Sequence, residues 1–137
     1  MNYLTDTSVV GPIMNRQEDV VNRVARLNPN VVLYTSVVTE GEIEYGLTRI
    51  GQGTLGPRRA ELQAALSLFT DILPVTREAA RSYARLKHQL QKMGRSIPDN
   101  DVWIAAIAVA TGLTVVHRDK HFTFIPGLAQ EDWLEPI

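Results

Sequence analysis

The chain has 137 residues, of which 45% are hydrophobic, so it can build a substantial core, and we expect one domain over residues 1–137. It contains no cysteine, which excludes disulfides, thiolate metal sites and cysteine nucleophiles. Its formal net charge of −1 excludes a chain that binds nucleic acid through a uniformly basic surface.

The first ten residues, MNYLTDTSVV, lack the basic start and the long apolar core of a signal peptide. No apolar run approaches the roughly 20 residues that a membrane-spanning helix needs. We therefore expect a cytoplasmic protein that does not bind membranes.

Short β-rich runs alternate with longer stretches of helical periodicity, a pattern that predicts a mainly parallel sheet between two layers of helices. The predicted fold class is thus α/β, a three-layer α/β/α sandwich. In chain order, we predict strands over 2–5, 31–34, 72–74, 113–116 and 133–134, and helices over 18–27, 37–50, 58–69, 77–93 and 102–110.

Acidic residues follow several of these strands. Asp6 leaves the first strand, Glu42 lies about one turn into the helix after the second, Asp101 opens the apolar helix, and Asp119 leaves the fourth strand. Because function in parallel α/β sheets collects at the carboxyl ends of the strands, we expect these four side chains on one rim.

Each acid also has a simpler interpretation. Aspartate is a favoured N-cap, and a carboxylate in the first turn of a helix gains roughly 0.3–1 kcal/mol from the helix dipole. Taken one at a time, Asp6, Asp99 and Asp101 fit this interpretation. Glu42 differs, because Glu40, Glu42 and Glu44 cannot share one solvent face of a helix, and one of them should point inward.

If the carboxylates do converge, their mutual repulsion requires a divalent cation, and oxygen ligands favour Mg²⁺ or Mn²⁺. Such an ion polarises phosphate and lowers the pKa of a bound water. The reaction class that this pattern predicts is metal-assisted hydrolysis of a phosphodiester.

Four blocks of the sequence together are similar to a known family: YLTDTS, VVTEGEIEYG, IPDNDVWIAA and VVHRDKHFTFIPGL. In this order and spacing they resemble PIN-domain proteins and, more narrowly, the VapC-type toxins of bacterial type II toxin–antitoxin pairs. The resemblance extends from Tyr3 to Leu134. It implies a Mg²⁺- or Mn²⁺-dependent endoribonuclease, usually a homodimer, that acts on RNA and is restrained by a cognate antitoxin.

Carried over residue by residue, the resemblance makes Asp6, Glu42, Asp101 and Asp119 the catalytic, metal-binding acids. Ser8 and Thr7 are expected to support Asp6 through hydrogen bonds. Asp99 either joins the pocket or caps the helix. Relatives often carry Thr or Ser at the position of His117, whose role is then either that of a metal ligand or a supporting one.

RNA also requires positive charge near the acidic rim. The candidates are Arg118 and Lys120, which flank Asp119, and the basic stripe Arg81, Arg85 and Arg95, which can equally be an ordinary solvated helix face. Trp103 is expected in the core rather than as a base-stacking platform.

Other classes fit less well. A haloacid-dehalogenase phosphatase needs a second aspartate where Ser8 stands, and a receiver domain needs a different order of acids. The remaining alternative is a PIN-like domain that binds RNA or a partner without cutting. Against it stands the set of four acids, since a scaffold without catalysis gains nothing from a repulsive cluster.

Overall fold

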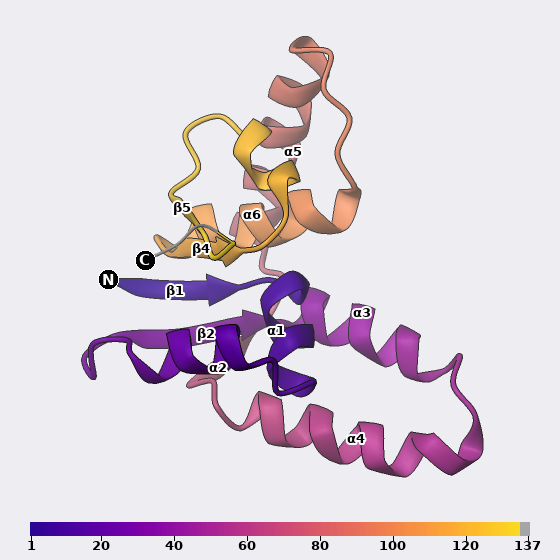
Figure 1. Ribbon diagram of the computed structural model, residues 1–137. Helices are drawn as coiled ribbons and strands as arrows, with labels where there is room; N and C mark the ends of the chain where they lie inside the picture. The colour runs from indigo at the N-terminus through magenta and orange to yellow at the C-terminus, as the bar shows by residue number, and fades with distance from the viewer. Residues whose placement is uncertain (135–137) are drawn as a thin grey trace.

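The computed structural model describes residues 1–134 of the chain (Figure 1). Along the chain, the elements are β1 (Asn2–Thr5), α1 (Thr7–Met14), α2 (Glu18–Ala25), β2 (Val32–Ser36), α3 (Val37–Leu47), α4 (Gln52–Leu66), β3 (Asp71–Leu73), α5 (Arg77–Lys92), α6 (Asp99–Thr111), β4 (Thr114–His117), the 3₁₀ helix η1 (Lys120–Phe124) and β5 (Gln130–Asp132).

The strands form one sheet in the order β3-β2-β1-β4-β5, and every pairing is parallel. The chain builds the sheet outward from β1 to β3 and then returns to the other side of β1 with β4. The carboxyl ends of β1 and β4 are therefore a topological switch point, where α/β proteins commonly bind ligands. Asp6 and Asp119 leave the sheet at this point.

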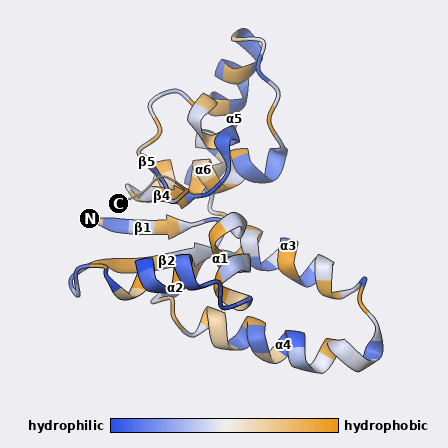
Figure 2. Ribbon diagram, viewed as in Figure 1, coloured by the Kyte–Doolittle hydropathy of each residue, from blue (hydrophilic) through white to orange (hydrophobic). Residues whose placement is uncertain are grey.

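The central strands are buried on both faces because their side chains alternate between two cores. Leu4 and Val115 pack in one core with α5 and α6, and Tyr3 and Val116 pack in the other with α1, α2 and α4. Figure 2 shows apolar residues along the strands and many hydrophilic residues on α2 and α5. The predicted α/β/α fold with a parallel sheet is confirmed.

Helix α6 is the most deeply buried helix among the described residues, with its side chains from Ile104 to Ala108 at most 1% exposed. It ends at Gly112, whose φ of 71° lies in the left-handed region that glycine adopts without strain. Among residues 1–134, no helix combines the length and apolar character needed to cross a bilayer.

The structure contains one helix that was not predicted, and it moves the bounds of several predicted elements. Residues 7–14 form α1 although they include Pro12, because four of the helix's residues (Val9, Val10, Ile13 and Met14) are buried in the core. Helix α4 begins at Gln52 instead of residue 58 and includes Pro57. The edge strand lies at Gln130–Asp132, and the predicted strand residues Trp133 and Leu134 form a turn.

Candidate active site

Asp6 is the first residue after β1 and is only 2% exposed. Ser8 Oγ donates a hydrogen bond of 2.7 Å to Asp6 Oδ1 and accepts one of 2.8 Å from the backbone N–H of Arg118. Burial raises the pKa of Asp6 to about 7, against the hydrogen bonds from Ser8, and the charges of Asp101 and Asp119 raise it further. Ser8 thus ties the end of β1 to the end of β4.

Glu42 projects from α3 and is half-buried. Thr7 Oγ donates a hydrogen bond of 2.9 Å to Glu42 Oε1, so α1 orients this carboxylate. Thr7 was predicted to support Asp6, but the acid that it contacts is Glu42. Glu44 instead pairs with Arg59 of α4 at 2.9 Å, which leaves Glu42 as the glutamate whose charge acts on Asp101.

Asp101 lies in the first turn of α6 and is 8% exposed. Burial raises the pKa of Asp101 to about 6, and the charges of Asp119 and Glu42 raise it too, while His121 lowers it. Three other titratable side chains are thus close enough to the Asp101 carboxylate to change its pKa.

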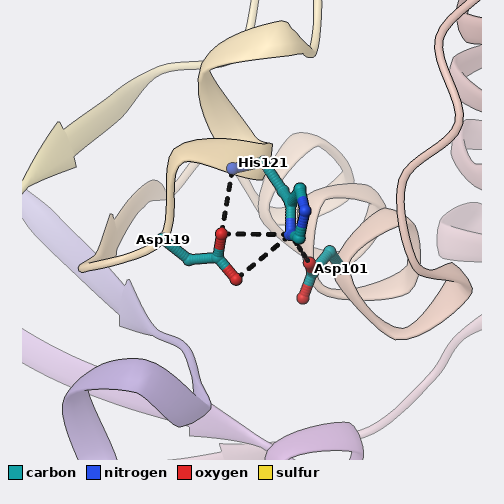
Figure 3. Close-up of side chains that lie close together, drawn as sticks. All are labelled: Asp101, Asp119 and His121. Atoms are coloured by element: carbon teal, nitrogen blue, oxygen red, sulfur yellow. Dashed lines mark hydrogen bonds and ion pairs between the residues drawn. The ribbon is translucent and has the colours of Figure 1, made fainter.

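Asp119 and His121 complete a tight group with Asp101 (Figure 3). His121 Nδ1 lies 3.0 Å from Asp119 Oδ1 and 3.4 Å from Asp101 Oδ2. The ligand atoms of the three residues all lie within 4.8 Å of one another. Asp6 and Glu42 are outside this group, yet near enough for their charges to couple to it.

His121 was not among the predicted site residues. The available signal was the spacing Asp119-Lys120-His121 directly after a strand, where a tight turn can direct both outer side chains to the same side. In the structure η1 makes that turn, and the backbone N–H of His121 donates to Asp119 Oδ1 at 3.0 Å.

His117 is fully buried below Asp119 and supports it. The backbone N–H of Asp119 donates to His117 Nδ1 at 3.2 Å, and His117 Nε2 lies 2.8 Å from Gln130 Oε1. Gln130 Nε2 in turn donates to the carbonyl of Phe122 at 2.8 Å. Both ring nitrogens of His117 are engaged in this chain of hydrogen bonds, which fits the supporting role and not that of a metal ligand.

Asp99 points away from this group. Its Oδ1 lies 2.6 Å from Lys87 Nζ and accepts a hydrogen bond of 3.0 Å from the Tyr83 hydroxyl. The hydrogen bonds from Lys87 and Tyr83 lower the pKa of Asp99. The N-cap position belongs to Pro98, and no side chain caps α6. Asp99 therefore joins α5 to α6 and neither caps the helix nor contacts Asp119.

Three of the predicted RNA contacts, Arg118, Arg81 and Arg85, are engaged or placed elsewhere in the structure. The Arg118 side chain is 16% exposed and turns to α2, where it binds Asp19 at 3.1 Å and Gln17 at 3.2 Å. Arg81 and Arg85 are exposed but lie on the side of α5 roughly opposite to Tyr83 and Lys87, which contact α6. For these arginines the structure favours the solvated-face interpretation.

The other two cations lie beside η1. Lys120 is its first residue and is exposed. The Arg95 guanidinium lies 4.3 Å from the centre of the Phe124 ring. Trp103 is half-buried and stacks on Tyr83 of α5 with ring centres 3.9 Å apart, so it lies at the edge of the protein and not in the core as predicted.

The donor set of the site fits a hard divalent cation. Two buried aspartates with raised pKa values, next to Asp119 and Glu42, form a negative cluster that a doubly charged ion would stabilise. Carboxylate oxygens are the ligands that such ions prefer, and one imidazole is compatible with them.

Comparisons with known proteins show the family of the chain. The family model of the PIN domain matches residues 3–128. The chain is 37% identical over 97 residues to ribonuclease VapC5 of Mycobacterium tuberculosis, covering 69% of this chain and 70% of that protein. It is 30% identical to ribonuclease VapC1 of Haemophilus influenzae, covering 97% and 98% of the two chains.

Solved structures show the same fold. A chain of VapBC2 from Rickettsia felis, bound to a DNA fragment from the promoter, superposes with a TM-score of 0.88 at 25% identity and covers 97% of this chain and 99% of that chain. A chain of VapBC-5 from Mycobacterium tuberculosis, a member of the VapBC family of toxin–antitoxin systems, matches with a TM-score of 0.70 at 32% identity, over 96% of each chain. This chain belongs to the PIN-domain family and, within it, to the VapC ribonucleases.

Proposed function

We propose that this protein is a metal-dependent endoribonuclease, the toxin of a type II toxin–antitoxin pair, and that it hydrolyses phosphodiester bonds of RNA in the cytoplasm. The observation that carries the proposal is the convergence of Asp6, Glu42, Asp101 and Asp119 at the switch point of the sheet, where burial and then the charges of neighbouring acids raise the pKa values of Asp6 and Asp101. Its similarity to ribonucleases named VapC supports the choice of RNA as substrate.

The four acids would hold Mg²⁺ or Mn²⁺. The bound ion supplies positive charge that polarises the scissile phosphate and acidifies the attacking water. The protein positions the groups that hold the ion. Ser8 and Thr7 hold the carboxylates of Asp6 and Glu42 by hydrogen bonds, so little reorganisation is needed when substrate binds.

Lys120 and Arg95 are the cations that we propose for RNA binding, because Lys120 follows Asp119 at the start of η1 and Arg95 contacts Phe124 at its end. Arg95 also lines a polar cavity of about 290 Å³ together with Lys87 and Asp99.

A cognate antitoxin is the second partner that we propose. Its docking surface would be the apolar cavity of about 590 Å³ between α1, α2 and α4. Val21 and Leu68 line this cavity and are 41% and 54% exposed, so an apolar segment of the antitoxin would cover them. The homodimer expected from the family resemblance stays a prediction.

The proposal is tested by cleavage of a mixture of structured RNAs with Mg²⁺ or Mn²⁺. The wild type should cleave and should lose cleavage in EDTA, and Asp101→Asn should reduce the rate by at least 10²-fold because a ligand is lost. The matched control is Asp71→Asn, an exposed aspartate at the start of β3, which should cleave like the wild type.

The rival function, a PIN-like domain that binds RNA or a partner without cutting, makes a different prediction. It requires that wild type and Asp101→Asn bind RNA equally and that neither cleaves it with either metal ion. That result would overturn the nuclease proposal.

A further inference from the structure

Besides the four acids, the site contains one imidazole, that of His121, to which the function proposed above assigns no role. His121 Nδ1 lies within 3.4 Å of carboxylate oxygens of both Asp101 and Asp119. Among residues 1–134, it belongs to the one group of histidine and acidic side chains whose ligand atoms are spaced for a metal ion.

The spacing of these atoms matches that of neighbouring ligands on one six-coordinate ion. With metal–ligand bonds of about 2.1 Å at right angles, adjacent ligand atoms lie roughly 3 Å apart. The distances from His121 Nδ1 to Asp119 Oδ1 and to Asp101 Oδ2 are 3.0 and 3.4 Å. The ligand atoms of all three residues lie within 4.8 Å of one another, so one ion could contact all three.

The fold holds the backbone of His121 in place and leaves its ring free to turn. The backbone N–H of His121 is bonded to Asp119, and the next residue, Phe122, is fully buried and stacks on His117 with ring centres 4.9 Å apart. The His121 side chain itself is 45% exposed, so its ring can turn without repacking the core.

We propose that His121 is a nitrogen ligand of the divalent ion through Nδ1 and that it shifts the preference of the site from Mg²⁺ toward Mn²⁺. This inference rests on the proposed function, because it assumes that the acidic cluster holds an ion. Its physical basis is that Mg²⁺ strongly prefers oxygen ligands, whereas transition-metal ions gain more from an imidazole.

The test uses the full chain, freed of metal by EDTA and dialysis and loaded with Mn²⁺. Pulsed electron paramagnetic resonance detects a nitrogen bound to Mn²⁺, and labelling of the histidines with ¹⁵N identifies it as imidazole. Calorimetric titrations give the affinities for Mn²⁺ and Mg²⁺. We expect a histidine nitrogen coupling in the wild type and its loss in His121→Gln. We also expect the ratio of Mn²⁺ to Mg²⁺ affinity to fall at least about tenfold in this variant.

Two further variants make the test specific. His88→Gln changes an exposed histidine on α5 and should keep both the coupling and the affinity ratio. His121→Asp replaces the nitrogen ligand with an oxygen ligand. This variant should bind Mg²⁺ at least as well as the wild type and should lack the nitrogen coupling. A role of His121 in folding alone would not change the affinity ratio.

The outcomes separate the inference from the proposed function. If Mn²⁺ binds and Asp101→Asn weakens it, but the wild type shows no histidine coupling or His121→Gln retains it, the ligand role of His121 is wrong and the nuclease site stands. If Mn²⁺ does not bind to the wild type, or if Asp101→Asn binds it equally well, the proposed metal site itself is wrong.

Discussion

The imidazole of His117 and the amide of Gln130 meet at 2.8 Å beneath the candidate active site, and together they connect β4, β5 and η1. Through His117 Nδ1 this pair also holds the backbone N–H of Asp119. His117 thus positions an acid of the site and does not face the proposed metal.

Replacing Gln130 with Ala should destabilise the protein and weaken metal binding. His117 Nε2 and the carbonyl of Phe122 would each lose a buried partner, which costs about 1–3 kcal/mol of unfolding free energy for each unsatisfied group. Urea denaturation and Mn²⁺ titration measure the two effects. Gln89→Ala, an exposed site on α5, is the control and should change neither quantity. Equal stability of the two variants would show that the hydrogen-bond chain is unimportant.

Asp6→Asn should stabilise the metal-free protein at pH 8. The pKa of Asp6 is about 7 in the folded protein and 3.8 in an ordinary aspartate, so the folded state binds this proton more tightly than the unfolded state. The resulting stability is complete below pH 4 and is lost as the pH rises to 7. Asparagine avoids this loss and can still accept the bond from Ser8.

The difference between Asp6→Asn and the wild type should thus be on the order of 2–4 kcal/mol at pH 8 and close to zero at pH 4. Urea denaturation in EDTA at several pH values measures it. A wild type that matches the variant at every pH would contradict the burial of a charged carboxylate at this position.

Binding of Mn²⁺ to the wild type should weaken as the pH falls. The pKa values of Asp101 and Asp6 are raised to about 6 and about 7, and a protonated carboxylic acid does not bind the ion. Calorimetric titration should show an affinity that rises steeply between pH 5 and pH 7 and levels off above it. An affinity independent of pH over this range would exclude both aspartates as ligands.

The two aspartates at the start of α6 should behave differently. Asp99→Asn removes the contacts with Lys87 and Tyr83 and should leave Mn²⁺ affinity within about twofold of the wild type, because the Asp99 carboxylate is turned to α5 and away from the acidic group. Asp101→Asn should lower it by at least about tenfold. If both variants bind Mn²⁺ alike, the assignment of Asp101 as the ligand is wrong.

Much of the fold follows from local patterns in the sequence. Continuous apolar runs predict β2 and β4, the stripe of α5 predicts its buried face, and Gly112 predicts the end of α6, because these signals depend only on neighbouring residues. Helix α1 does not follow from them. Its Gly11-Pro12 pair indicates a break, and the burial of Val9 and Ile13 against distant elements outweighs it.

The sequence by itself determined which carboxylates follow the strands, and hence the chemical class of the site, because parallel strands bring their carboxyl ends to one edge wherever they stand in the chain. Only the tertiary structure decided which partner each of the remaining polar side chains contacts. His121 turns into the acidic group, Asp99 turns to Lys87, and Arg118 turns to Asp19. Long polar side chains choose among partners that are distant in the chain, and only the packing of the helices fixes which partner is within reach.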